Sequence, residues 1–234
     1  MPLKGEVKYT EAVFIKESRQ RFLCTVLLEN EEIECYVSSS SKLSKYINLE
    51  NFRVLLSKNK ASKLRTLYTL EAAEISRGNY VYLNLNKVNQ LFENHLVNNG
   101  ILERSIYREK KVSDNLKVDF YLDMQGYFEI KALLNSTDEI EFPDTSSNRL
   151  QRQLSEYIKL LKSGQTVTFA FVALSSNIKH FKWNSAKMKL KELFAEATTR
   201  GLQTQAFTIE YSYGAFNLKE NVELQEKIIK SYFD

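Results

Sequence analysis

Residues 118–132 alternate between apolar and polar side chains on both sides of a short polar turn. A period of two is typical of β-strands with one buried face, so the segment predicts a hairpin with arms at 117–122 and 127–133. The two apolar sets can share one face only if the loop has an odd number of residues, which favours a three-residue loop at 123–125. The expected buried face consists of Val118, Phe120, Leu122, Phe128, Ile130 and Ala132.

The same register brings four charged side chains together on the opposite face. Asp119 is expected opposite Glu129, and Lys117 opposite Lys131. Two carboxylates are hard oxygen ligands of the kind that Mg²⁺ or Mn²⁺ prefers, and Mg²⁺ keeps several waters, so a backbone carbonyl and waters can complete the set. Lys131 could orient an attacking water or stabilise negative charge on a phosphoryl group. The pattern therefore indicates phosphodiester cleavage, although Glu-x-Lys on a strand is also typical of a solvated surface pair.

Composition places the chain among soluble globular proteins. It has 234 residues, of which 43% are hydrophobic and 26% charged, enough for one large domain or two modest ones. No stretch approaches the length of a membrane span and no apolar signal region precedes the first strands, so a cytoplasmic location is expected. Cys24 and Cys35 lie in strand-like runs and are expected to be buried, reduced thiols. Glycine-rich phosphate loops, nucleophile elbows and zinc-ligand spacings are all missing from the sequence.

Positive charge gathers in the first half of the chain. The net charge is only +4, but residues 42–65 hold seven basic residues against one acid, Glu50. Such an excess can attract a phosphate backbone, and it is equally compatible with a solvated basic surface. Aromatic residues of the same half, including Phe22 and Tyr36, could stack on bases or fill a small barrel. The candidate nucleic-acid-binding residues are Arg21, Lys42, Lys45, Lys58, Lys60, Lys63 and Arg65.

The two halves of the chain differ in their hydrophobic pattern. Residues 10–83 read as short strands with few helices, which predicts a small β-barrel. From Asn86, expected to cap a helix, helical patterns alternate with strands, and the apolar run at 167–174 predicts a central strand buried on both faces. We therefore expect a mixed α/β protein with domains at 1–83 and 84–234.

Three blocks of the second half resemble motifs of one known family. They are Val118-Asp119-Phe120, Phe128-Glu129-Ile130-Lys131 and Phe142-Pro143-Asp144. Together with segments at 16–22, 57–71 and 87–91, they resemble the sugar fermentation stimulation protein A family over roughly residues 12 to 211. Leu116-Lys117 departs from the Ser-Arg that the family usually has before its Ile-Asp block.

The resemblance implies a fold and a set of roles. The fold would be an OB-like barrel followed by a restriction-endonuclease-like α/β domain of the PD-(D/E)xK type, with DNA, or else RNA, as partner. Asp119 and Glu129 would bind Mg²⁺ or Mn²⁺, Lys131 would be catalytic, and Glu109 could be an additional or indirect ligand. The residues implied to line the same cleft are Asp144, Arg149 and Lys117.

Two other functions stay open at this point. The first is a non-catalytic DNA-binding or regulatory protein, linked to sugar metabolism, that keeps a nuclease-like cleft. The second is a protein-interaction scaffold without a nucleic-acid role. Salt-sensitive binding without cleavage would favour the first of these, and binding that is absent or insensitive to salt would favour the second.

Overall fold

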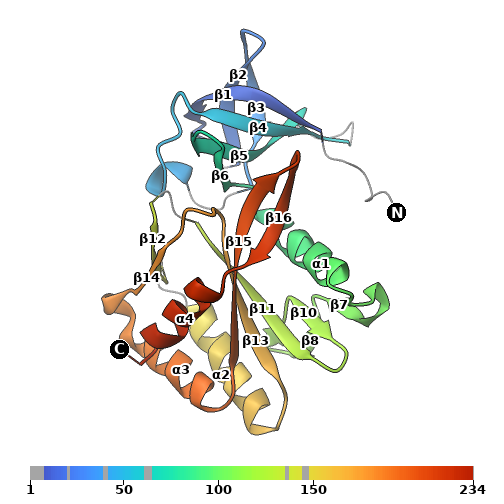
Figure 1. Cartoon of the computed structure of the whole chain (residues 1–234), viewed down its shortest axis with the longest axis vertical. Helices are drawn as coiled ribbons and strands as arrows, with labels where there is room; N and C mark the ends of the chain where they lie inside the picture. Colours follow the sequence, from blue (N-terminus) through green and yellow to red (C-terminus); the bar gives the residue numbers. More distant parts are fainter. Residues whose placement is uncertain are drawn as a thin grey trace.

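The computed structural model describes residues 8–19, 22–38, 42–60, 65–134, 137–143 and 148–233. Two six-stranded sheets follow one another along the long axis of the molecule (Figure 1). The first sheet has the order β3-β2-β1-β4-β5-β6. Its strands are β1 (Tyr9–Glu17), β2 (Leu23–Leu28), β3 (Glu31–Tyr36), β4 (Arg53–Lys58), β5 (Tyr68–Ser76) and β6 (Asn79–Tyr82).

Five strands of the first sheet close into a ring. Strand β3 pairs in parallel with β5, which joins the two ends of the order β3-β2-β1-β4-β5. This strand order is that of an OB-type Greek-key barrel, so the expected OB-like barrel is confirmed. Its interior is filled by apolar side chains that are at most 4% exposed, among them Phe14, Val26, Val54, Leu56 and Leu70.

The second sheet is mixed. Its order is β16-β15-β13-β11-β10-β7, in which β11, β13 and β15 are parallel and the other neighbours antiparallel. Its strands are β7 (Ile106–Arg108), β10 (Phe120–Leu122), β11 (Gly126–Leu133), β13 (Val167–Ala173), β15 (Gln203–Ser212) and β16 (Ala215–Glu220). Two small pairs accompany it, β8 (Lys111–Ser113) with β9 (Leu116–Lys117), and β12 (Glu139–Phe142) with β14 (His180–Trp183).

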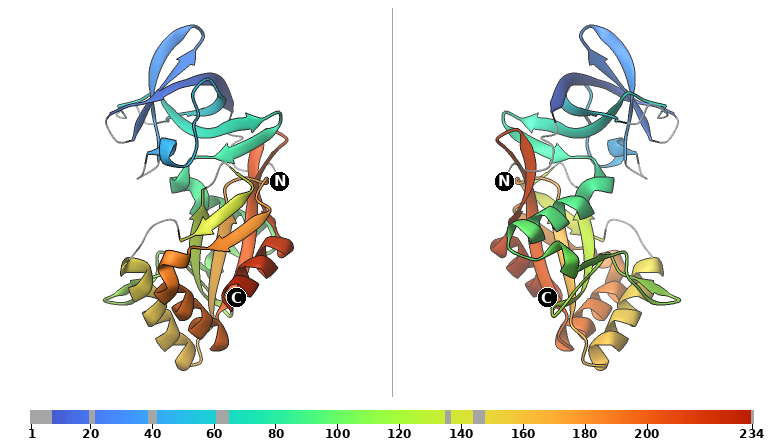
Figure 2. Two further views of the ribbon diagram at one scale, coloured as in Figure 1. Left: turned by 90° about the vertical axis from the view of Figure 1, so that its left-hand side faces the viewer. Right: turned by 90° about the vertical axis from the view of Figure 1, so that its right-hand side faces the viewer.

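Helices cover both faces of the second sheet (Figures 1 and 2). On one face, Phe92 packs against Phe128 and Phe207. On the other face, Tyr157 packs against Phe169. Every residue of β13 is buried between these layers, which confirms the expected central strand. The first face carries α1 (Val88–Asn98), and the second carries α2 (Asn148–Lys162), α3 (Met188–Thr199) and α4 (Val222–Ser231).

The predicted hairpin is partly correct. Leu122 pairs with Gly126 across a three-residue loop, and Phe120 pairs with Phe128, as expected. A continuous strand over 117–122 is wrong, because the chain bends between β9 and β10. Lys117 therefore pairs with Lys111 in the β8–β9 hairpin, and not with Lys131.

Two local expectations are also corrected. Ala132 is exposed, because it lies on the part of β11 that extends beyond its pairing with β10. Asn86 does not cap α1: the helix begins at Val88 after a 3₁₀ turn at Leu85–Lys87, and the Asn86 amide donates to the Tyr36 hydroxyl at 3.2 Å.

One hydrophobic cluster continues from the barrel into the second sheet. It joins barrel residues such as Val26 to Phe120 and Phe207, and the Tyr82 backbone amide donates to the Leu174 carbonyl at 2.7 Å. The division expected at residue 83, at the end of β6, stays a prediction. Cys24 and Cys35 lie opposite one another in β2 and β3 and are buried, free thiols, as expected.

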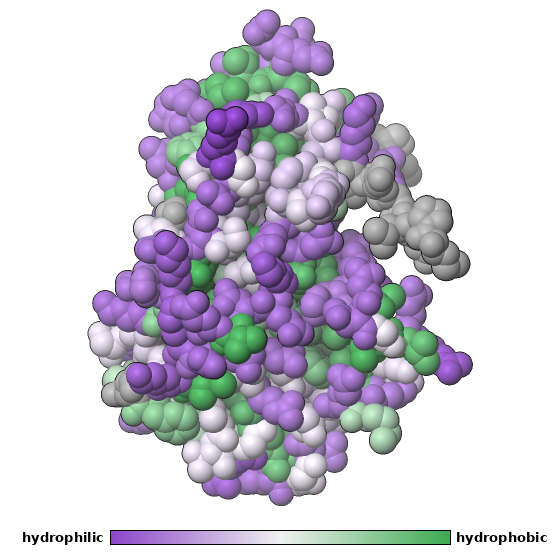
Figure 3. Space-filling model, in the orientation of Figure 1, coloured by the Kyte–Doolittle hydropathy of each residue, from purple (hydrophilic) through white to green (hydrophobic). Residues whose placement is uncertain are grey.

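The face of the molecule that Figure 3 shows is mainly polar. Hydrophilic residues cover most of the face in Figure 3, and its hydrophobic areas are small and separate. Over the described ranges, no helix has the length and apolar character needed to cross a membrane.

Candidate metal and nucleic-acid site

Asp119 lies where the chain rejoins the second sheet. Arg108 of β7 pairs with Phe120 of β10, and the residues between them leave the sheet as the β8–β9 excursion. Two backbone hydrogen bonds close its base: Glu109 N donates to Asp119 O at 2.7 Å, and Val118 N donates to Lys110 O at 3.0 Å. The position of Asp119 is therefore fixed by backbone on both sides.

The Asp119 carboxylate is oriented by two donors. The backbone amide of Ile130 donates to its Oδ2 at 2.8 Å, and Asn89 of α1 donates to its Oδ1 at 3.1 Å. Burial raises the pKa of Asp119, and the negative charge of Glu129 raises it further, whereas the two hydrogen bonds and Lys131 lower it. The two carboxylates are thus close enough to repel, and a cation shared between them would relieve that repulsion.

Glu129 is buried against α2. Its side chain is 5% exposed and receives three hydrogen bonds: from the Tyr157 hydroxyl at 2.6 Å, from the Gln153 amide at 3.1 Å and from Lys131 Nζ at 2.6 Å. Gln153 and Tyr157 are four residues apart, so both project from the same side of α2. Burial, followed by the charge of Glu129, raises the pKa of Tyr157, which keeps its hydroxyl protonated as a donor.

Lys131 lies on the same face of β11, two residues after Glu129. Its side chain is 21% exposed. Besides Glu129, its Nζ approaches Gln153 Oε1 at 3.5 Å and lies 6.0 Å from the centre of the Phe169 ring. Asp119, Glu129 and Lys131 thus come together, as the spacing along the sequence indicated.

The remaining residues expected at this site are placed differently. Glu109 and Lys117 are both mostly exposed and pair with one another at 2.5 Å. Arg149 is exposed, one turn before Gln153 on α2, and is near enough to lower the pKa of Tyr157. Asp144 lies outside the described residues.

The donor set at this site is small. Within the described ranges, no group of three or more His, Cys, Asp or Glu side chains is arranged to hold a metal ion. The two carboxylates Asp119 and Glu129 nevertheless fit a hard divalent cation that keeps most of its water ligands, such as Mg²⁺.

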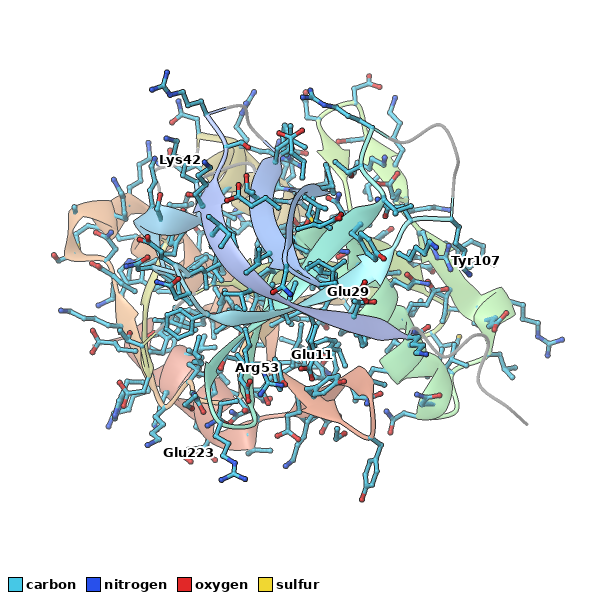
Figure 4. The ribbon with its side chains drawn as sticks, turned by 90° about the horizontal axis from the view of Figure 1, so that it is seen from above. Glu11, Glu29, Lys42, Arg53, Tyr107 and Glu223 are labelled. Atoms are coloured by element: carbon cyan, nitrogen blue, oxygen red, sulfur yellow. The ribbon has the colours of Figure 1, made fainter. Side chains whose placement is uncertain are left out.

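The candidate basic residues lie on the barrel half. Lys42, Lys45, Lys58, Lys60 and Arg65 are all exposed, and Arg21 and Lys63 fall outside the described residues. Figure 4 shows Lys42 well apart from Arg53 and Glu11, which lie together.

Ion pairs neutralise part of the basic segment. Arg53 is paired with Glu11 at 2.6 Å and with Glu74 at 3.3 Å, and Arg65 lies 3.7 Å from Glu34. The free positive charge of this segment is therefore smaller than the sequence count suggests.

Three residues of the site were not assigned from the sequence. Asn89 holds Asp119, and Gln153 and Tyr157 hold Glu129. Tyr157 occupies an apolar helix position, so the sequence pattern assigned it to the core. Its hydroxyl, with the amide side chain of Gln153 one turn earlier on the same helix face, was the sequence feature that could have indicated a hydrogen-bonding role.

Comparison with known proteins places the chain in a family. The family model described as "Sugar fermentation stimulation protein RE domain" matches residues 86–215, more than half of the chain. The chain belongs to the sugar fermentation stimulation protein family. A homologue from Thermotoga maritima is 24% identical over 224 residues, covering 94% of this chain and 96% of that protein. Another from Actinobacillus succinogenes is 25% identical over 222 residues, covering 90% and 91%.

A solved structure of the same family has the same fold. It is that of SfsA from Pyrococcus furiosus, which was determined in complex with Ca²⁺. The two chains superpose with a TM-score of 0.73 at 19% sequence identity, over 94% of this chain and 95% of the other. The family resemblance expected from the sequence blocks is therefore confirmed.

Proposed function

We propose that this protein binds DNA and cleaves phosphodiester bonds in a reaction that depends on a divalent metal ion. The observation that carries the proposal is the convergence of Asp119, Glu129 and Lys131 on one sheet face, with the two carboxylates close enough to raise the pKa of Asp119. Glu129 is buried and Asp119 partly buried, and Lys131 supplies one positive charge for the two carboxylates, so the second negative charge is costly to keep without a further cation or a substrate.

Each residue has a defined part in the proposed reaction. Asp119 and Glu129 would hold Mg²⁺ or Mn²⁺, and Asn89, Gln153 and Tyr157 fix the orientation of these two carboxylates. The bound ion would lower the pKa of a coordinated water and neutralise charge on the phosphoryl oxygens. Lys131 would orient the attacking water or stabilise negative charge at the phosphorus.

The barrel would contribute affinity. Exposed lysines at 42, 45, 58 and 60 can contact phosphates and release their counterions, which makes such binding sensitive to salt. The Ca²⁺ in the Pyrococcus furiosus relative is in keeping with a site for a hard cation, because Ca²⁺ also binds oxygen ligands.

The test is a cleavage assay on purified protein. Single- and double-stranded DNA and RNA are incubated with Mg²⁺, Mn²⁺ or EDTA, using the wild type and the variants Asp119→Asn, Glu129→Gln and Lys131→Ala. We expect cleavage that needs the metal and falls by about a hundredfold or more in each variant. Lys159→Ala, which removes an exposed lysine paired with Glu156 on α2, is the matched control and should cleave like the wild type. Cleavage that persists in EDTA and in Lys131→Ala would refute the proposal.

A non-catalytic DNA-binding role is the second candidate. The observation in its favour is that both oxygens of Glu129 already accept hydrogen bonds from Tyr157, Gln153 and Lys131. If the assay detects salt-sensitive binding without cleavage under any metal, this second function replaces the first.

A further inference from the structure

A pocket opens on the barrel, lined by residues that the proposed cleavage does not use. Its volume is about 450 Å³, within the range of small-molecule sites. It lies between the ends of β2 to β5 and the turn that leads into α1. The lining residues are Phe22, Leu23, Tyr36, Asn59, Arg65, Thr66, Thr69, Asn84, Asn86 and Lys87.

One wall of the pocket is aromatic. The rings of Phe22 and Tyr36 are stacked, with centroids 6.2 Å apart and planes 18° from parallel. Phe22 is 42% exposed and has φ +68°, a conformation that is unfavourable for a bulky residue. Its carbonyl accepts from Val37 N at 2.9 Å, which holds this backbone in place. Together, the two rings offer an apolar face on which a planar group could stack.

Two amide side chains, those of Asn59 and Asn84, also line the pocket. Asn84 is 3% exposed, and its side chain does not cap the 3₁₀ turn that follows it. An amide side chain offers two donors and one acceptor. By contrast, the Asn59 amide is occupied by Thr66 O at 2.9 Å and Thr69 Oγ1 at 2.7 Å. A ligand in the pocket would therefore meet the Asn84 amide rather than that of Asn59, which is already occupied.

The cations of the pocket are each matched by an acid. Lys87 Nζ lies 2.5 Å from the fully buried carboxylate of Glu71, and Arg65 lies 3.7 Å from Glu34. The lining is thus nearly neutral, which favours an uncharged planar group over a phosphate. Phosphates attached to such a group could reach Lys58 and Lys60, the exposed neighbours of Asn59 in the chain.

We propose that this pocket binds the base of one nucleotide, with Phe22 and Tyr36 as its stacking wall and Asn84 as its hydrogen-bonding residue. An aromatic ring stacks on any base, and an amide pairs with the donors and acceptors on a base edge. The nucleotide is either part of a single strand or a free mononucleotide. The single-stranded form rests on the proposed function, because it adds a base contact to the same nucleic-acid interface.

The experiment compares strands with and without bases. Fluorescence anisotropy in EDTA measures the affinity for a labelled single strand of about twelve nucleotides and for an abasic strand of equal charge. We expect the base-bearing strand to bind at least about tenfold more tightly, and Phe22→Ala to reduce its affinity roughly five- to a hundredfold without affecting the abasic strand. Phe22→Trp should restore binding. Competition by AMP, GMP, CMP and UMP tests the free nucleotide as the source.

A matched control separates stacking from general damage. Tyr213→Ala also removes an exposed aromatic ring at a positive φ, at the β15–β16 turn, and should bind like the wild type. Asn84→Asp, which keeps the shape of the side chain but removes its donors, should change the preference among the four mononucleotides. Because Phe22 is at the surface, its variant tests the pocket even if an Asn84 variant folds poorly.

The outcomes distinguish this proposal from the nuclease proposal. Equal affinity for base-bearing and abasic strands, with no competition by mononucleotides, overturns the pocket even if the same preparation cleaves DNA. Base-dependent affinity that Phe22→Ala abolishes supports the pocket even if no cleavage occurs. Direct binding of a labelled mononucleotide without binding of either strand also supports the base site and identifies the free nucleotide as its ligand.

Discussion

Asp119 is held in a place where its charge is unfavourable. Burial and the neighbouring Glu129 raise its pKa, so the folded protein favours the protonated form more than the unfolded chain does. The stability that this contributes is fully present below the pKa of an unfolded aspartate, about 4, and is lost as the pH rises through the raised value. At neutral pH, the ionised Asp119 therefore costs stability unless a cation compensates its charge.

Replacing this carboxylate should stabilise the metal-free protein at neutral pH. We expect Asp119→Asn to unfold at a higher urea concentration than the wild type near pH 7, because an amide oxygen can still accept from Ile130 N, and we expect the advantage to vanish below about pH 4. Mg²⁺ at about ten times its dissociation constant should raise the unfolding free energy of the wild type by about 1.4 kcal/mol and leave the variant unchanged. Asp114→Asn, at an aspartate that is 94% exposed, should show neither effect. An Asp119→Asn variant that is less stable at pH 7, or that responds equally to Mg²⁺, would contradict this reading.

At the scale of elements, the contact between α2 and β11 positions the second carboxylate. Gln153 and Tyr157 reach Glu129 from one side of the helix, and Tyr157 also packs its ring edge-on against Phe169 of β13. When a buried carboxylate loses a hydrogen-bond donor, the desolvation of its charge is no longer compensated and the folded state is destabilised. The hydroxyl of Tyr157 should therefore matter for stability as well as for the site.

Removing that hydroxyl tests the contact. We expect Tyr157→Phe to lower the free energy of unfolding by about 1.5–3 kcal/mol, as for a hydrogen bond to a charged group. Tyr232→Phe is the control, because among the described residues the Tyr232 hydroxyl meets only the neutral hydroxyl of Thr204, at 3.4 Å, and its removal should cost about 1 kcal/mol or less. In a Glu129→Gln background the effect of Tyr157→Phe should shrink, and urea titrations of the four proteins measure this coupling. Additive effects of the two substitutions would show that the hydroxyl does not act through Glu129.

The elements also show which parts of the site the sequence could predict. The odd length of the loop at 123–125 was enough to predict that Phe120 pairs with Phe128, because a slip of one residue would turn the buried face outward. The bend before β10 was not predicted. At the bend, the Asp119 carboxylate accepts the hydrogen bond of the Ile130 backbone amide, which a backbone carbonyl would accept in a continuous strand pair, and the alternation of side chains does not reveal this exchange. The contacts of Gln153 and Tyr157 with Glu129 span more than twenty residues along the chain and depend on how the helix lies on the sheet. Periodicity within a segment contains no information about such a contact.

At the scale of the whole molecule, the barrel and the second sheet share a core. Phe216 of β16 has its ring centre 5.4 Å from that of Tyr9 in β1 and 4.8 Å from that of Tyr82 in β6. It is 6% exposed, and the hydrophobic cluster that contains it extends through both halves. A residue of the last strand thus packs against the first and last strands of the barrel half, so the two halves should unfold together.

Truncating Phe216 should destabilise both halves equally. We expect Phe216→Ala to lower the unfolding free energy by about 3–5 kcal/mol, as for a large ring removed from a core. Trp183 fluorescence reports on the second half, and amide exchange of β1 to β6 reports on the barrel, so the two probes together show whether one transition covers both. Phe194→Ala removes a fully buried ring from the separate cluster beneath α2, α3 and α4, and in a cooperative molecule it should shift both probes as well. If Phe194→Ala shifts only the fluorescence transition while barrel exchange stays at its wild-type rate, the barrel folds independently, and residue 83 is then a true domain boundary despite the shared core.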